Sequence, residues 1–257
     1  MNDLSDSHLS ITWIGHATAL IEIEGVRILT DPALRDRIGP LRRYGPRIRP
    51  EWLTDIDAVI ISHAHRDHLD PDSLKLLGGN PRHVVPEGAA AFMRSSGLLH
   101  VDELLVGEAT TVAGVNIQAI HAEHGGFRLP FGPSASAIGY VVSATHRVYF
   151  GGDTAIFQGM ADLKGEIDVA LLPVGGWGVT RGRRHLNAKT AVEALKLISP
   201  RLVVPIHWGT LWPVGLRIFR PSLFSSPGPD FAARARALTP EVEVELMRPG
   251  GKVDLHT

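Results

Sequence analysis

The chain has 257 residues, 44% of them hydrophobic and 21% charged, which excludes a largely disordered protein. Its formal net charge of −1 excludes a bulk nucleic-acid binder, so nucleic acid is not expected as a partner and any anion recognition must be local. Because there is no cysteine, disulfides and thiolate metal sites are also excluded, and a metal site would have to use histidine nitrogen and carboxylate oxygen.

The first predicted elements are strands. Residues 10–31 have strand-like patterns, with a tight antiparallel turn at Gly25 between residues 19–24 and 26–29. Residues 35–50 combine six arginines with three prolines and are predicted to be a loop.

After this loop, strands and helices alternate. Residues 58–62 form a short apolar run that is typical of a strand buried on both faces, and a helix is predicted over 70–77 with Asp70 as its cap. Helical spacing of apolar residues predicts helices over 188–198 and 230–238. Further strands are predicted at residues 83–85, 115–120, 137–142, 147–150, 169–173 and 202–206. These elements together predict an α/β protein.

No feature of the sequence predicts a division of the chain or a membrane anchor. No linker or solenoid-length repeat interrupts residues 1–257, which are therefore predicted to form one domain. The N-terminal residues lack the basic and then apolar pattern of a signal peptide. Because no apolar run reaches the roughly 20 residues that span a bilayer, we expect a cytoplasmic protein.

A cluster of metal-ligand residues follows the buried strand at 58–62. His63 and His65 are two positions apart, so in an extended chain both imidazoles point to one side and can reach one metal. Asp67 and His68 follow at the strand-to-helix turn, where adjacent side chains diverge and can serve a second metal beside the first. An isolated His-x-His is usually a surface or core pair, whereas this longer pattern after an apolar strand predicts a metal site.

Further ligand-type residues occupy similar positions at the ends of other predicted strands. They are His121 and His124 after 115–120, Asp153 after 147–150, and His207 after 202–206. Functional groups gather at strand ends because the sheet holds them rigidly while loops leave them open. Each of these residues alone could be a cap or a loop residue, but their recurrence predicts a shared site.

Five segments together resemble the metallo-β-lactamase superfamily. They read Thr-Trp-Ile-Gly-His-Ala-Thr at 12–18, Leu-Thr-Asp-Pro at 29–32, Ile-Ser-His-Ala-His-Arg-Asp-His-Leu-Asp at 61–70, Gly-Asp-Thr at 152–154 and Ile-His-Trp-Gly-Thr at 206–210. Within the superfamily they are most similar to the branch of N-acyl-phosphatidylethanolamine-hydrolysing phospholipase D and L-ascorbate-6-phosphate lactonase. The resemblance implies a four-layer αββα sandwich with the metals at one edge of the β-sandwich.

The resemblance also implies how the metals are held. The implied ligands are His63, His65 and His124 for a first ion, Asp67, His68 and His207 for a second, and Asp153 as a bridge between both. Asp31 is expected to orient the ligands. His124 is preferred to His121 because the family's ligand closes an apolar-x-x-His segment, and His121 stays the alternative. His16 is expected either to support the site through hydrogen bonds or to be a structural turn residue.

The implied cofactors are two divalent metal ions. Zinc is preferred, with manganese or iron as alternatives, because the ligands are nitrogen and oxygen. The implied chemistry is attack on phosphorus or a carbonyl carbon by a hydroxide that the two metals activate. Asp67 is expected to act both as ligand and as proton acceptor. His185 is expected to contact the leaving group or the scissile phosphate, the alternative being a helix-entry residue on a solvated loop.

The expected function is therefore a binuclear metal-dependent hydrolase acting on a phosphodiester, ester or lactone bond of a small anionic substrate. The arginines from Arg35 to Arg49 suit a phosphate or an anionic membrane surface, the alternatives being a solvated loop or a contact in a homo-oligomer. Arg181, Arg183 and Arg184 add positive charge before His185.

The sequence after Thr210 departs from the phospholipase pattern, and its apolar residues fit an acyl pocket, a lid or an oligomer contact. A nucleic-acid-processing nuclease of the same fold and a non-catalytic metal-binding protein are the alternative functions.

Overall fold

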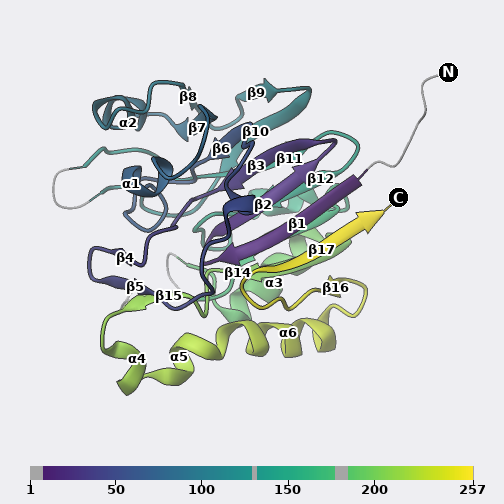
Figure 1. The fold of residues 1–257 in the computed structure, drawn as a ribbon. Helices are drawn as coiled ribbons and strands as arrows, with labels where there is room; N and C mark the ends of the chain where they lie inside the picture. The colour runs from purple at the N-terminus through teal and green to yellow at the C-terminus, as the bar shows by residue number, and fades with distance from the viewer. Residues whose placement is uncertain (1–7, 129–131, 177–184, 257) are drawn as a thin grey trace.

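The structure is a computed structural model that describes residues 8–128, 132–176 and 185–256 (Figure 1). Two seven-stranded sheets form its centre. The first sheet has the order β17 (Gly251–His256), β1 (His8–Gly15), β2 (Thr18–Ile23), β3 (Val26–Thr30), β6 (Ala58–Ile60), β7 (Arg82–Pro86) and β8 (Val101–Leu104). Its strands run antiparallel from β17 to β3 and parallel from β3 to β8.

The second sheet also combines antiparallel and parallel strands. Its order is β16 (Glu243–Val244), β14 (Leu202–Ile206), β13 (Val169–Pro173), β12 (Arg147–Phe150), β11 (Ile138–Ser143), β10 (Val115–His121) and β9 (Ala109–Val112). Strands β9 to β12 are antiparallel, and β12, β13, β14 and β16 are parallel. All strands that the sequence predicted between residues 10 and 206 are present, with ends that differ by one or two residues.

The main core lies between the two sheets. Alternate residues of β1, among them Ile11 and Trp13, face Ile117, Tyr140 and Phe150 of the second sheet, and all five are fully buried. Burying one such side chain stabilises the fold by about 1.5–3 kcal/mol. The period-two pattern of the strands therefore holds the sandwich together.

Helices cover both outer faces of the sandwich. The helices α1 (Pro71–Leu74) and α2 (Ala90–Ser95), with the short helix η1 (Pro50–Trp52), pack on the first sheet. The helices α3 (Ala188–Ile198) and α6 (Pro227–Leu238), with η2 (Gln158–Leu163), pack on the second. Figure 1 shows these helices on opposite sides of the strands. The expected four-layer αββα sandwich is confirmed.

A third sheet of three short strands corrects the prediction of a loop over residues 35–50. Strands β4 (Arg37–Ile38) and β5 (Leu41–Arg43) form a hairpin, and β15 (Leu211–Pro213) pairs antiparallel with β5. Proline is a poor strand former, but β15 from the far end of the chain supplies hydrogen bonds to β5. Two short helices follow β15, namely α4 (Leu216–Phe219) and α5 (Pro221–Ser225).

Two predicted helices differ in length from those in the structure. The helix predicted over 70–77 covers only α1, although Asp70 caps it as expected by accepting a hydrogen bond from the Ser73 amide at 3.1 Å. The helix predicted from residue 230 begins at Pro227, because proline suits the first turn. Helix α3 has the predicted bounds and a capping box formed by Asn187 and Thr190.

The ends of five strands meet at one edge of the sandwich and place the candidate ligands there. The residues that follow these ends are His16 after β1, Asp31 after β3, His63 to His68 after β6, Asp153 after β12 and His207 after β14. Among the described residues, we found no helix that has the length and apolar character needed to cross a membrane.

Candidate metal centre

Three histidines form a first cluster. His63 Nε2 lies 2.9 Å from His65 Nδ1, and His124 Nε2 lies 3.3 Å from that same nitrogen of His65. His63 and His65 come from the loop after β6, while His124 comes from the loop after β10. The three nitrogens all lie within 4.8 Å of one another, so they can converge on one ion. The structure thus places together the three residues that the resemblance assigned to a first metal.

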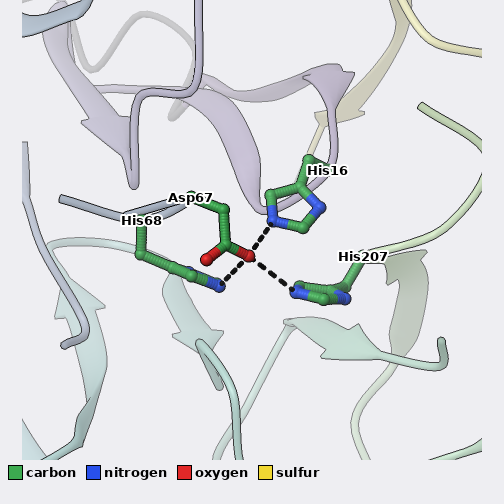
Figure 2. A group of neighbouring side chains, drawn as sticks. All are labelled: His16, Asp67, His68 and His207. Atoms are coloured by element: carbon green, nitrogen blue, oxygen red, sulfur yellow. Dashed lines mark hydrogen bonds and ion pairs between the residues drawn. The ribbon is translucent and has the colours of Figure 1, made fainter. Parts of the chain in front are cut away.

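A second cluster surrounds the carboxylate of Asp67. Its Oδ2 lies 3.0 Å from His16 Nε2, 3.4 Å from His68 Nε2 and 3.9 Å from His207 Nε2. Figure 2 shows the carboxylate at the meeting point of the three imidazole rings. Asp67, His68 and His207 are the residues expected at a second metal, and His16 is the additional member.

Asp153 lies between the two clusters. Its Oδ1 is 3.1 Å from His207 Nε2, and its Oδ2 is 3.4 Å from His68 Nε2 and 4.0 Å from His124 Nε2. His185 Nδ1 approaches the same Oδ2 at 3.3 Å. A single carboxylate thus contacts members of both clusters, which is the position that a bridging ligand needs.

Asp31 orients one histidine of each cluster. Its Oδ2 lies 2.6 Å from His68 Nδ1 and accepts a hydrogen bond from Ser62 Oγ at 2.5 Å, while its Oδ1 accepts one from the Ser62 amide at 2.7 Å. Ser62 Oγ in turn lies 2.9 Å from His63 Nδ1. Because both Nδ1 atoms are held in this way, both Nε2 atoms are left for a metal.

Three residues of the site have left-handed backbone. The φ angles of His16, Asp31 and His207 are 55°, 33° and 63°. Such conformations cost about 1–3 kcal/mol each in residues other than glycine and gather at functional sites. Here hydrogen bonds hold them, since the His207 amide donates to the His16 carbonyl at 2.8 Å and the His16 amide donates to Thr210 Oγ1 at 2.6 Å.

The electrostatics of the site favour the ligand forms of most members. Burial lowers the pKa of His63 and His207 well below the ordinary value, so both are neutral. Burial would raise the pKa of Asp67 and Asp153, but the neighbouring histidines outweigh it and hold both pKa values well below the ordinary range. His68 differs, because three surrounding carboxylates outweigh burial and raise its pKa well above the ordinary value.

Several inward-facing atoms of the site need a partner. Within the described part of the chain, no hydrogen bond reaches the buried atoms His68 Nε2, His207 Nε2 and Asp153 Oδ1. Their contacts are ion pairs, such as the one between His207 Nε2 and Asp153 Oδ1 at 3.1 Å, and a buried polar group that lacks a hydrogen bond costs about 1–3 kcal/mol. A cation among them would remove this cost, and imidazole nitrogen with carboxylate oxygen is a donor set that binds zinc, manganese or iron. The residues present therefore fit divalent metal ions.

A cavity of about 480 Å³ opens above the clusters. Its floor contains ligand-type residues of both clusters, with Asp153 and His185. Four apolar residues and two arginines line its walls. The residues that line these walls are Ile38, Pro40, Leu41, Phe127, Arg66 and Arg128.

Sequence reasoning missed Arg128, which is only 7% exposed. Its Nη1 donates to the carbonyl of Ala64 at 3.1 Å and to the carbonyl of Leu69 at 2.6 Å, and its guanidinium lies 4.8 Å from the centre of the Phe92 ring. Ala64 lies within the segment His63–His68 and Leu69 directly follows it, so Arg128 clamps that segment. No local pattern connects Arg128 with residues 64 and 69, whereas Ser62 could have been noticed beside the histidine motif.

Of the remaining candidate residues, His121 lies outside the site and His185 lies inside it. The side chain of His121 is half exposed, and its Nε2 lies 3.4 Å from Glu123 Oε2, outside both clusters. The side chain of His185 is 14% exposed and belongs to the site, which differs from a residue on a solvated loop. The three arginines before it, Arg181, Arg183 and Arg184, lie outside the described residues.

The chain is similar in sequence to known proteins. The sequence model of the β-lactamase superfamily domain matches residues 26–208. The N-acyl-phosphatidylethanolamine-hydrolyzing phospholipase D 1 of Caenorhabditis elegans is 35% identical over 237 residues, covering 82% of this chain and 66% of the nematode protein. A metal-dependent hydrolase of Methanopyrus kandleri is 30% identical over 250 residues, covering 94% of this chain and 98% of the archaeal protein.

The chain is shorter than some of its relatives. It spans 59% of the length of three mycobacterial proteins to which it is 36% identical. Among solved structures, the metallo-hydrolase Igni18 of Ignicoccus hospitalis shares the fold with a TM-score of 0.76 at 23% identity, covering 96% of this chain and 98% of Igni18.

Proposed function

The chain belongs to the metallo-β-lactamase superfamily, and we propose that it is a hydrolase that uses two divalent metal ions. The observation that carries this proposal is the pair of ligand clusters that Asp153 joins at the floor of the cavity. Within the described chain the buried atoms His68 Nε2 and Asp153 Oδ1 make no hydrogen bond, and a cation between the clusters would give them a partner. The relative from Methanopyrus kandleri, named a metal-dependent hydrolase, supports the same assignment.

The two clusters suggest how the ions would be held. The first ion would be held by His63, His65 and His124, the second by Asp67, His68 and His207, and both by Asp153. His16 lies 3.0 Å from Asp67 Oδ2, so it would position this carboxylate. Zinc is the preferred metal, with manganese or iron as alternatives, and such a pair supplies a water of low pKa and stabilises negative charge on the substrate.

Residues around the clusters would handle the substrate. His185 lies at the cavity floor against Asp153, so it is placed to contact the leaving group or the scissile phosphate. Asp67 faces the same cavity and accepts hydrogen bonds, so it is placed to accept a proton during the reaction. Arg66 and Arg128 line the cavity, and guanidinium groups bind phosphate and carboxylate well. These groups support a phosphodiester, ester or lactone bond of an anionic substrate as the target.

The test combines metal content with hydrolysis. Purified protein is stripped with a chelator, reloaded separately with zinc, manganese and iron, and assayed on bis(p-nitrophenyl) phosphate, lysophospholipid esters and lactones. We expect activity that depends on metal and that is lost in His124→Ala.

The matched control is His121→Ala, because His121 lies near His124 in sequence but outside the clusters, and it should keep its activity. Equal activities of the stripped and reloaded protein, or of His124→Ala and the native protein, would contradict the proposal.

A further inference from the structure

A surface beside the cavity combines exposed apolar side chains with arginines. We call it the β15–α4 surface, and it consists of Val214, Leu216, Ile218 and Phe219 together with Arg37, Arg42, Arg217 and Arg220. Ile218 and Phe219 are 81% and 78% exposed, more than any other large apolar side chain in the described chain. Contiguous exposed apolar residues mark interaction sites, because exposing them to water is unfavourable.

The apolar side chains of this surface add nothing to the core. Helix α4 has only four residues, none of them buried, and it begins after Gly215, whose φ of 82° turns the chain outward. Figure 1 shows α4 at the outer end of the molecule, below the small sheet. The tip of this segment is thus held out to solvent and is available to a partner.

Two of the four arginines, Arg42 and Arg217, lie against one aromatic ring. Trp212 of β15 lies opposite Arg42 of β5 in the small sheet, which brings the two segments together. The guanidinium groups of Arg42 and Arg217 lie 5.5 Å and 5.0 Å from the centre of the same Tyr44 ring. Residues 211–226 contain no aspartate or glutamate, so this part of the surface is positively charged.

The surface continues into the wall of the cavity. The Val214 amide donates to the Pro40 carbonyl at 3.0 Å, and Pro40 lines the cavity with Ile38 and Leu41. A partner that covers α4 would therefore lie next to the mouth of the candidate metal centre.

We propose that the β15–α4 surface docks on an anionic lipid surface. Ile218 and Phe219 would enter the apolar layer, and the arginines would bind lipid phosphates, as in other proteins that lie on membranes. A second copy of the chain fits less well, because a two-fold contact through α4 would bring Arg217 and Arg220 of both copies together. A lipid surface offers both the negative charge and the apolar layer that this composition matches.

The experiment is cosedimentation of the protein with vesicles of phosphatidylcholine alone or mixed with phosphatidylglycerol. We expect binding only to the anionic vesicles, weaker binding at high salt, and a loss of about tenfold or more in the double variant Ile218→Ser/Phe219→Ser. Arg217→Gln/Arg220→Gln should lose affinity for the same vesicles.

The matched control is Leu99→Ser, because Leu99 is 72% exposed but lies between α2 and β8, away from this surface. It should bind as the native protein does. Since Ile218 and Phe219 lie outside the core, their double variant should keep its unfolding midpoint, metal content and hydrolysis of soluble substrates, which separates this proposal from the proposed function.

Three results would overturn the proposal. The first is absence of binding to anionic vesicles, and the second is native binding by Ile218→Ser/Phe219→Ser. The third is a dimeric native protein and a monomeric double variant, both seen by light scattering, with no vesicle binding by either. The surface would then be a subunit contact.

Discussion

Asp31 Oδ2 lies 2.6 Å from His68 Nδ1, and both side chains are fully buried. Through Ser62 the same carboxylate also reaches His63, a member of the other cluster. One buried aspartate thus sets the orientation of a histidine in each cluster, which makes it the residue that couples the two halves of the site.

The first prediction concerns this coupling. Asp31→Asn keeps the shape of the side chain but removes its charge, so we expect metal affinity to fall by about 10–100-fold. Competition with a chromophoric chelator measures this affinity. Ser62→Ala is the comparison, because it removes only the connection to His63 and should weaken one of the two ions more than the other. Native affinity in Asp31→Asn would show that the carboxylate does not orient the ligands.

The second prediction concerns the proton that His68 releases when metal binds. Burial would lower the pKa of His68, but Asp153, Asp67 and Asp31 outweigh it, so the pKa is well above the ordinary value and His68 holds a proton at neutral pH without metal. A cation on Nε2 must displace that proton. Metal binding should therefore release about one proton from this residue and should weaken as the pH falls.

Titration calorimetry in buffers of different ionisation enthalpy measures this release. The observed enthalpy should vary with the buffer in the native protein and should vary less in His68→Gln. No dependence on the buffer at neutral pH would contradict the protonation of His68.

The third prediction concerns the clamp formed by Arg128. Arg128→Met leaves the carbonyls of Ala64 and Leu69 without their charged donor, so we expect a loss of about 1.5–3 kcal/mol in the free energy of unfolding, together with weaker metal binding. Urea unfolding measures the loss. Arg66→Met is the control, because Arg66 lines the same cavity but is exposed, so its loss should raise KM for anionic substrates without changing stability.

The fourth prediction concerns Gly228 in α6. A Cβ placed there would lie 2.2–2.7 Å from the indole of Trp208, whose ring stacks on Trp13 at 5.4 Å and which follows the candidate ligand His207. We expect Gly228→Ala to destabilise the protein by about 1–3 kcal/mol through overpacking, and to disturb the His207 loop.

Thermal unfolding with and without metal measures this effect. Gly78→Ala is the matched control, since nothing lies within 4 Å of its Cβ position. If the two variants unfolded alike, the packing of Trp208 would not support the site.

Sequence patterns predicted those strands and helices whose formation depends mainly on neighbouring residues. The apolar alternation of the strands and the helical spacing over residues 188–198 predicted elements that the structure contains. The small sheet was missed because its two-residue and three-residue strands β4 and β5 are completed by β15, from which a long stretch of chain separates them. The strands β8, β9, β16 and β17 and the helices α2, α4 and α5 were not predicted either.

The residues of the candidate site were also predicted only in part. Residues that follow apolar strands, such as Asp153 and His207, could be named because strand ends converge at a sheet edge. Arg128 could not, because its role depends on two carbonyls that only the folded chain brings near it. The sequence left open whether His16 supports the site, and the structure places it against Asp67.

We expect two divalent ions to bind between the clusters that Asp153 joins. The most direct measurement is the metal content of the purified, zinc-reloaded protein, determined by mass spectrometry after desalting, in the native chain and in Asp153→Asn. About two ions per native chain and a clear loss in the variant are expected. A native chain that retains well under one ion after reloading would contradict this expectation.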